Sequence, residues 1–68
     1  MSKARARQRI VDHLENAAEP LTADEVSDAT GLPPDEAVTQ LNVLRRRGAV
    51  VNRRGRRWAI PAAESRSV

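Results

Sequence analysis

The spacing of proline and glycine limits how long any helix or strand in this chain can be. Pro20 disfavours helical backbone at the residue before it, and Gly31 supplies the positive φ that commonly ends a helix. Gly48 and Gly55 interrupt the C-terminal half, and Pro61 ends its last apolar run. These positions divide the 68 residues into helix-length segments followed by strand-length ones. One small domain with a thin core is expected at this length.

The first segment, residues 4–18, has helical periodicity. Its apolar residues lie at i, i+1, i+4, i+7 and i+8, which is one face of a helix. We therefore expect a helix over residues 4–18 whose inward side carries Ile10, Val11, Leu14, Ala17 and Ala18.

The second segment opens with the strongest local signal in the chain. Thr22 is predicted to be an N-cap and Glu25, three residues later, to complete a capping box, while Leu21 and Val26 are placed to form a hydrophobic staple. A short helix should therefore begin directly after Thr22, with Val26 and Ala29 facing inward.

Two prolines followed by two acids open the third segment, at residues 33–36. Proline suits the first helical position, and acids in the first turn complement the positive end of the helix dipole. We expect a helix that runs to about Arg46 and turns inward Ala37, Val38, Leu41 and Leu44.

The C-terminal part reads as strands. Residues 49–52 and 58–60 are predicted to pair across a turn centred on Gly55, and Trp58, the chain's only aromatic residue, is expected in the core rather than stacked on a base. We expect residues 62–68 to be a disordered tail. The predicted fold class is α+β, mainly helical, with three helices and a C-terminal two-stranded β-hairpin.

Charge is sorted along the chain. Residues 12–36 hold eight acids and no lysine or arginine, whereas residues 45–57 hold seven arginines and no acid. A concentrated basic edge is typical of a polyanion-binding protein; a solvated surface is the alternative. Residues 1–7 are expected to be a basic arm or the frayed start of the first helix, and such an arm could follow the phosphate backbone of DNA. The alternative is that they belong to an exposed helix face. The cations concerned are Lys3, Arg5, Arg7 and Arg9.

Composition argues against several kinds of site. Without cysteine there is no disulfide or thiolate metal site, and the single His13 cannot form an imidazole cluster. No nucleophile and base at a recognisable spacing and no phosphate-binding loop are present, so we expect no enzymatic activity, cofactor or metal. No signal-peptide or transmembrane run follows the basic start. A cytoplasmic, nucleoid-associated protein without a membrane partner is expected.

Three motifs follow one another from the third helix onward: Leu41-x-x-Leu44-Arg-Arg-Arg-Gly48-Ala-Val-Val, then Arg-Arg-Gly-Arg-Arg, then Trp58-x-Ile60. In this order, residues 8–61 resemble a winged helix-turn-helix domain of small prokaryotic transcription regulators. The resemblance implies that the third helix approaches the major groove of duplex DNA and that the hairpin tip touches backbone or minor groove. The tip also resembles the Arg-Gly-Arg core of AT-hook peptides, which implies a narrow, AT-rich minor groove.

The predicted DNA contacts form two groups. The hairpin group is Arg53, Arg54, Gly55, Arg56 and Arg57, and the group on the third helix is Thr39, Gln40, Asn42, Val43, Arg46 and Arg47. Gln40 and Asn42 could pair with adenine, and Arg46 with guanine or a phosphate. The alternatives are that the residues of the third helix are ordinary polar surface residues, and that the hairpin is a turn that needs Gly55, with arginines that only increase solubility. The acids that open the third helix would lie close to phosphates, which favours the hairpin as the main contact.

Duplex DNA binding by a small transcription regulator or nucleoid-associated protein is the leading hypothesis. The alternative is an interaction module whose acidic face binds a basic protein or, in a homodimer, the hairpin of a second copy; that face comprises Asp24, Glu25, Asp28, Asp35 and Glu36. RNA binding is disfavoured because the chain has no aromatic platform for unstacked bases.

Overall fold

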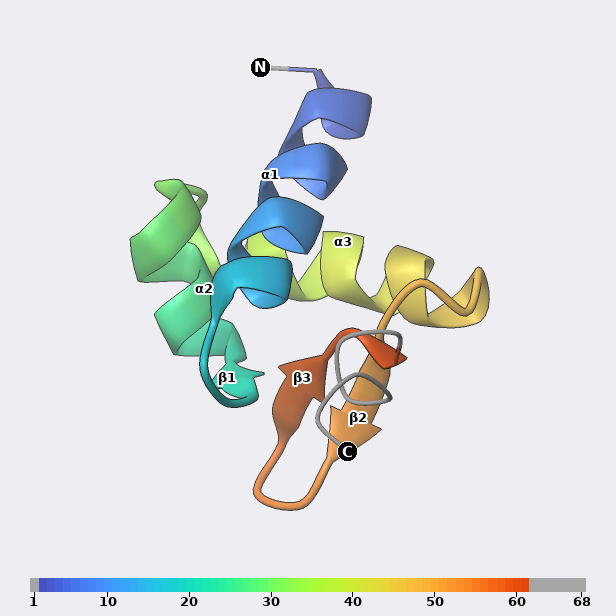
Figure 1. Ribbon diagram of the computed structural model, residues 1–68. Helices are drawn as coiled ribbons and strands as arrows, with labels where there is room; N and C mark the ends of the chain where they lie inside the picture. The colour runs from blue at the N-terminus through green and yellow to red at the C-terminus, as the bar shows by residue number, and fades with distance from the viewer. Residues whose placement is uncertain (1, 62–68) are drawn as a thin grey trace.

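The computed structural model describes residues 2–61, which form a small, mainly helical α+β domain (Figure 1). Within them lie three helices and a three-stranded antiparallel sheet, so the predicted α+β class is confirmed. In chain order the elements are α1 (Lys3–Asn16), β1 (Leu21–Thr22), α2 (Ala23–Thr30), α3 (Pro34–Arg46), β2 (Val51–Arg53) and β3 (Arg57–Ala59). The tail predicted to be disordered, residues 62–68, lies outside the described residues.

The predicted C-terminal hairpin is present as β2 and β3. The sheet has the strand order β1-β3-β2, so it contains a third strand, β1, that was not predicted. Leu21 pairs with Trp58 across β1 and β3, and Trp58 pairs in turn with Asn52 of β2. A strand of two residues is too short to show an alternating pattern, and its partner lies far along the chain. The extra strand ties the hairpin to the start of α2.

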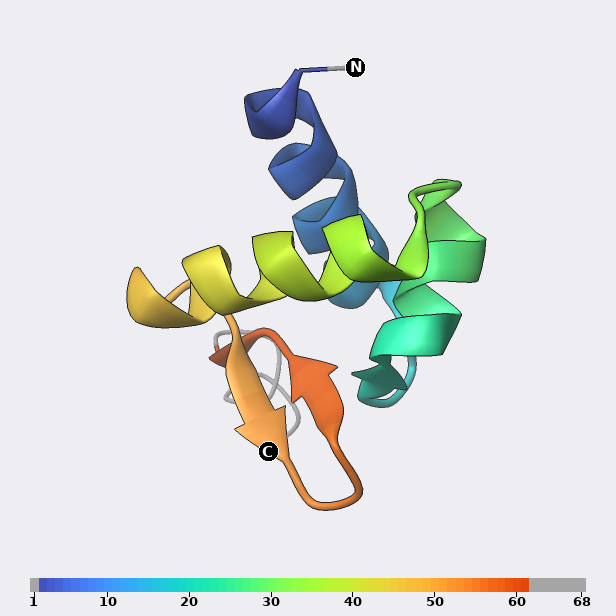
Figure 2. The same cartoon turned by 180° about the vertical axis from the view of Figure 1, so that it is seen from behind.

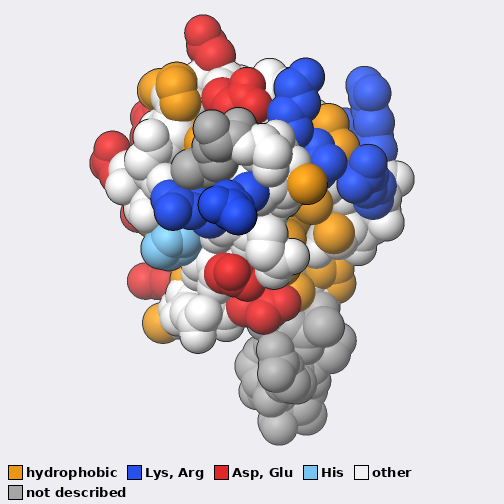
Figure 3. Space-filling view, turned by 90° about the horizontal axis from the view of Figure 1, so that it is seen from above, with side chains coloured by type: hydrophobic (Ala, Val, Ile, Leu, Met, Phe, Trp, Pro, Cys, Tyr) orange, Lys and Arg blue, Asp and Glu red, His pale blue; other side chains and the backbone are white. Residues whose placement is uncertain are grey.

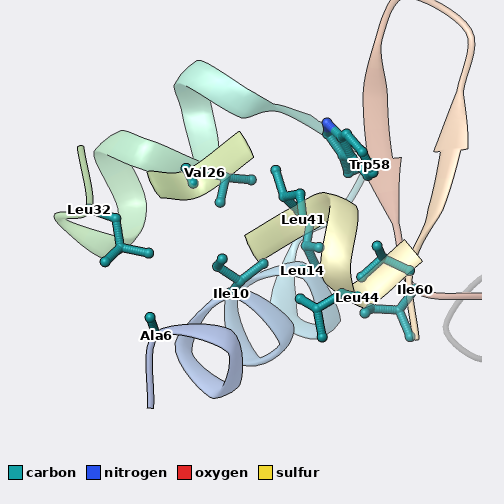
Figure 4. Close-up of a cluster of buried hydrophobic side chains, with 11 residues drawn as sticks. Ala6, Ile10, Leu14, Val26, Leu32, Leu41, Leu44, Trp58 and Ile60 are labelled. Atoms are coloured by element: carbon teal, nitrogen blue, oxygen red, sulfur yellow. The ribbon is translucent and has the colours of Figure 1, made fainter. Parts of the chain in front are cut away.

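The core forms where the three helices meet the base of the sheet. Figure 4 shows side chains of α1, α2 and α3 pointing toward one another, with Trp58 and Ile60 entering from the hairpin. Trp58 is buried, as predicted. The buried apolar side chains that form this cluster are Ala6, Ile10, Leu14, Val26, Leu32, Ala37, Leu41, Leu44, Val50, Trp58 and Ile60.

The predicted helix boundaries of α2 and the end of α3 are confirmed. Thr22 caps α2: its hydroxyl accepts the Glu25 amide N–H at 3.2 Å, while the Glu25 carboxylate accepts the Thr22 N–H at 2.9 Å. Gly31 follows α2 with φ 77°, in the left-handed region that favours glycine. The backbone N–H of Ala49 bonds the Leu44 carbonyl just after Gly48, which closes the end of α3.

Helix α1 ends two residues earlier than predicted. Ala17 is extended at φ −77° and ψ 138°, and Ala18 is exposed instead of facing the core. The chain has to leave α1 early enough to reach β1. Residues 17 and 18, which helical periodicity predicted to be part of α1, therefore belong to the connection before Pro20.

Two other inward predictions were wrong, one on α2 and one on α3. On α2, polar side chains occupy the buried positions. Ala29 is exposed, whereas Ser27 and Thr30 are buried. Their hydroxyl groups donate to the carbonyls of Leu32 and Val26, so burial leaves no hydrogen bond unmade. On α3, Val38 is also exposed.

Candidate nucleic-acid interface

The hairpin tip, residues 53–57, carries four exposed arginines on a tight turn. Arg53 of β2 pairs with Arg57 of β3, which leaves residues 54–56 as the connecting loop. Gly55 and Arg56 adopt positive φ values of 79° and 59°, so the chain reverses within three residues. Figure 2 shows the hairpin projecting from beneath α3, away from the helices.

Arg57 bonds the hairpin tip to the body of the domain. Its Nη1 donates to the Pro20 carbonyl at 3.1 Å and lies 3.5 Å from Oε1 of Glu25. These contacts join β3 to the segment that enters α2. Arg57 therefore orients the hairpin, while Arg54 and Arg56 extend it into solvent.

The carboxylate of Glu25 lies in a stabilising environment. The hydrogen bond from the Thr22 backbone N–H is the largest cause that lowers its pKa, followed by the bond with the Thr22 side chain. Desolvation opposes them, and the positive charge of Arg57, the smallest of the four effects, also lowers the pKa. The ionised form is thus favoured, and Glu25 is already committed to the α2 cap.

The outer face of α3 lies opposite its buried side. The buried residues are Ala37, Gln40, Leu41 and Leu44, and helical spacing puts Asp35, Thr39, Asn42 and Arg46 on the opposite face. Val38 and Arg45 lie at the edge of this outer face, and both are exposed. Viewed from behind, α3 crosses in front of α1 with the hairpin below it, so the outer face and the hairpin tip are open on the same side (Figure 2).

The prediction that Gln40 reads a base was wrong, because its side chain is buried with only 2% of its surface exposed. Its amide oxygen accepts from Nη1 of Arg7 at 2.9 Å, and its amide nitrogen donates to Oε1 of Glu36 at 2.9 Å. Helical spacing could have shown the burial, because Gln40 lies three residues after Ala37 and four before Leu44. It could not have shown the partner on α1, which is 33 residues away. Gln40 joins α1 to α3 instead.

Two further residues that were predicted to contact DNA from α3, Val43 and Arg47, do not lie on the outer face of the helix. Val43 is half-buried, and its position on the helix lies toward one flank. Arg47 is exposed but lines a hollow of about 230 Å³ between α1 and the end of α3, together with Ala4, Arg7, Gln8, Val11 and Leu44. The outer face therefore keeps three of the predicted contacts, Thr39, Asn42 and Arg46.

The N-terminal cations belong to a helix rather than to an arm. Ser2 caps α1, which begins at Lys3, and the Arg9 guanidinium reaches the Thr30 carbonyl at 3.5 Å. With Arg7 bonded to Gln40, two of the four cations contact neighbouring helices. The start of α1 and the hairpin tip lie at opposite ends of the molecule in Figure 1, so Lys3 and Arg5 are not part of the hairpin surface.

Charge is only partly sorted in space. In the view from above, lysine and arginine side chains form one group toward the right and a second near the middle, and acidic side chains lie at the top and left and also directly below the middle group (Figure 3). The exposed cations nearest the outer face of α3 include Arg45, which the prediction omitted. Arg45 lies in the last turn of α3, where its positive charge also complements the helix dipole.

A search of protein-family models, of curated proteins and of solved structures found no match to this chain. Among residues 2–61, no helix combines the length and apolar character needed to cross a membrane. The same residues contain no group of three or more histidine, cysteine, aspartate or glutamate side chains that could hold a metal ion.

Proposed function

We propose that this chain is a winged helix-turn-helix protein that binds duplex DNA, as a small transcription regulator or nucleoid-associated protein. The observation that carries the proposal is the hairpin tip, an acid-free loop of exposed arginines held out on the side to which the outer face of α3 is open. In this proposal Arg54 and Arg56 enter the minor groove, and α3 lies in or near the major groove.

The geometry of the tip supports an arginine-in-groove contact. Positive φ at Gly55 and Arg56 makes the loop narrow, and an added Cβ at Gly55 would have only the Arg57 Nε atom nearby, at 3.8 Å. The glycine therefore lets the backbone approach a surface closely, while arginine extends on either side. A narrow A·T minor groove attracts such side chains through its enhanced negative potential.

Salt dependence tests the proposal. Six exposed arginines lie at the end of α3 or in the tip, namely Arg45, Arg46, Arg47, Arg53, Arg54 and Arg56. If binding neutralises about six phosphates, affinity for duplex DNA should fall by roughly three decades between about 50 mM and about 200 mM salt. An affinity that scarcely changes with salt would contradict the proposal.

Paired substitutions locate the contact. Arg54→Ala with Arg56→Ala should weaken binding to duplex DNA. It should also reduce the slope of log affinity against log salt concentration by the contribution of about two phosphate contacts. Lys3→Ala with Arg5→Ala is the matched control, because it removes the same charge at the opposite end of the molecule. Equal losses from the two pairs would indicate a net-charge effect instead of a hairpin contact. Gel shifts on AT-rich and GC-rich duplexes would measure the groove preference.

A second candidate function rests on the acidic side chains of α2 and the start of α3. Asp24, Asp28 and Asp35 are exposed, and Glu25 already binds a hairpin arginine of its own chain. A basic protein, or the basic hairpin of a second copy of this chain, would bind to these exposed carboxylates. Sedimentation at low and high salt, with and without DNA, separates the two functions: a salt-sensitive oligomer that ignores DNA would favour the interaction module.

A further inference from the structure

Val38 lies on the wrong side of α3 for a core residue. Within residues 2–61 it is the large hydrophobic side chain that remains exposed, with 41% of its surface accessible. Exposed apolar residues are common when they are isolated, but Val38 is not isolated. It lies at the edge of the outer face, on the side that faces the hairpin.

An open hollow of about 630 Å³ separates α3 from the hairpin and the start of α2, and Val38 forms one of its walls. Ala23 and the ring of Trp58 contribute further apolar surface, and Asn52 and Arg56 line the hairpin side. The hollow therefore combines an apolar wall with a cation at its rim.

Arg56 at the rim of the hollow would attract a phosphate, but the wall formed by Val38 and Asp24 would not. Asp24 lines it and would repel an anion, and the valine side chain offers no hydrogen-bond donor. A ligand that suits this surface is uncharged and has an apolar projection. On duplex DNA the group with that character is the C5-methyl of thymine, which is displayed in the major groove.

The neighbours of Val38 on α3 fit the same base pairs. Thr39 donates its hydroxyl to the Asp35 carbonyl at 2.9 Å, which leaves its methyl group and an acceptor for an outside partner. Asn42 lies one helical turn beyond Val38, and an asparagine amide bonds the N6 and N7 atoms of adenine. Methyl contact and adenine recognition together describe A·T pairs.

We propose that Val38 is a specificity-determining residue that contacts the C5-methyl group of thymine in the major groove. The inference rests on the proposed function and adds a base preference for α3 that is separate from any minor-groove preference of the arginines. Because the recognised group is a methyl on a pyrimidine, 5-methylcytosine should be accepted at the same place.

Deoxyuridine tests the contact, since it differs from thymidine by this methyl group. Wild-type protein should bind an AT-rich duplex about fourfold more tightly than the same duplex with every thymine replaced by uracil, a difference that corresponds to burial of about one methyl group. Val38→Ala should reduce this ratio to about one. Alanine is the better helix former, so the variant should fold.

Two controls distinguish the sources of any change. Arg54→Ala should weaken binding to both duplexes and keep the ratio, which separates the methyl contact from altered minor-groove shape; Arg56 is left in place because it lines the hollow. In a GC-rich duplex, replacing cytosine by 5-methylcytosine should strengthen binding by wild type and leave Val38→Ala unaffected.

Four outcomes would overturn the inference. Wild type and Val38→Ala could show the same thymine-to-uracil ratio, or wild type could show no preference although it binds both duplexes; in both cases DNA binding itself would stand. Alternatively, Val38→Ala could dissociate a wild-type oligomer in sedimentation while the ratio stays at one, which would assign the hollow to a protein contact. Failure to bind either duplex would reject the proposed function as well.

Discussion

The Arg57 guanidinium lies 3.5 Å from the Glu25 carboxylate, and this contact joins the hairpin to the N-terminal cap of α2. The same carboxylate accepts the Thr22 N–H, so a single side chain serves both the helix cap and the hairpin. The position of the basic tip is thereby coupled to an acid that titrates.

The first prediction concerns acid unfolding. The folded-state pKa of Glu25 is lowered, chiefly by the Thr22 backbone N–H, so its carboxylate contributes stability above the unfolded pKa and loses it as pH falls through the folded pKa. Glu25→Gln should therefore flatten the acid limb of a plot of Tm against pH. Glu15→Gln, an exposed glutamate of α1, is the charge-matched control and should leave that limb in place. Identical curves for Glu25→Gln and wild type would contradict the prediction.

The second prediction concerns Gln40. Gln40→Met keeps the shape of the side chain but leaves Arg7 and Glu36 without their amide partner, so it should cost about 1–3 kcal/mol of unfolding free energy, measured by urea denaturation. Asn42→Ala, on the outer face of α3, should change stability less and DNA affinity more. If Gln40→Met altered base preference while stability held, the assignment of Gln40 to the helix interface would be wrong.

Most of the helix boundaries could be predicted from the sequence, because the residues that cap or end a helix lie close together along the chain. The capping box at Thr22 and the glycine after α2 depend on residues at most four positions apart, and both were predictable. The pairing of Leu21 with Trp58 and the hydrogen bond from Arg7 to Gln40 join residues more than 30 positions apart. No periodicity within one segment carries that information.

The candidate site was predictable to the same degree. The basic tip follows from composition and a turn glycine, whereas the role of Arg57 follows from a carbonyl at Pro20 that only the folded chain brings near. Val38 was assigned to the core because its helical position is close to those of Ala37 and Leu41; the hairpin leaves a hollow there instead of covering it.

The third prediction separates the shape of the tip from its charge. Gly55 has room for a methyl group, so Gly55→Ala should cost about 1 kcal/mol through its positive φ alone. Arg56 also has a positive φ of 59°. In Arg56→Gly, relief of that strain offsets the entropy of the added glycine, so Tm should stay close to wild type while DNA affinity falls. A large drop in Tm for Arg56→Gly, measured by circular dichroism, would show that the arginine side chain stabilises the turn.

The last prediction concerns the acid at the start of α3. Asp35 is exposed on the outer face, where it would lie close to phosphates if α3 enters a groove. Asp35→Asn should therefore raise affinity for duplex DNA severalfold at low salt, and added salt should screen the gain. The same change removes a favourable charge at the helix N-terminus and should lower stability by about 0.3–1 kcal/mol. We therefore expect Asp35→Asn to raise DNA affinity and to lower stability. Glu15→Gln again serves as the charge-matched control, and an equal gain in affinity from both variants would mean that only net charge matters and that α3 does not approach the DNA.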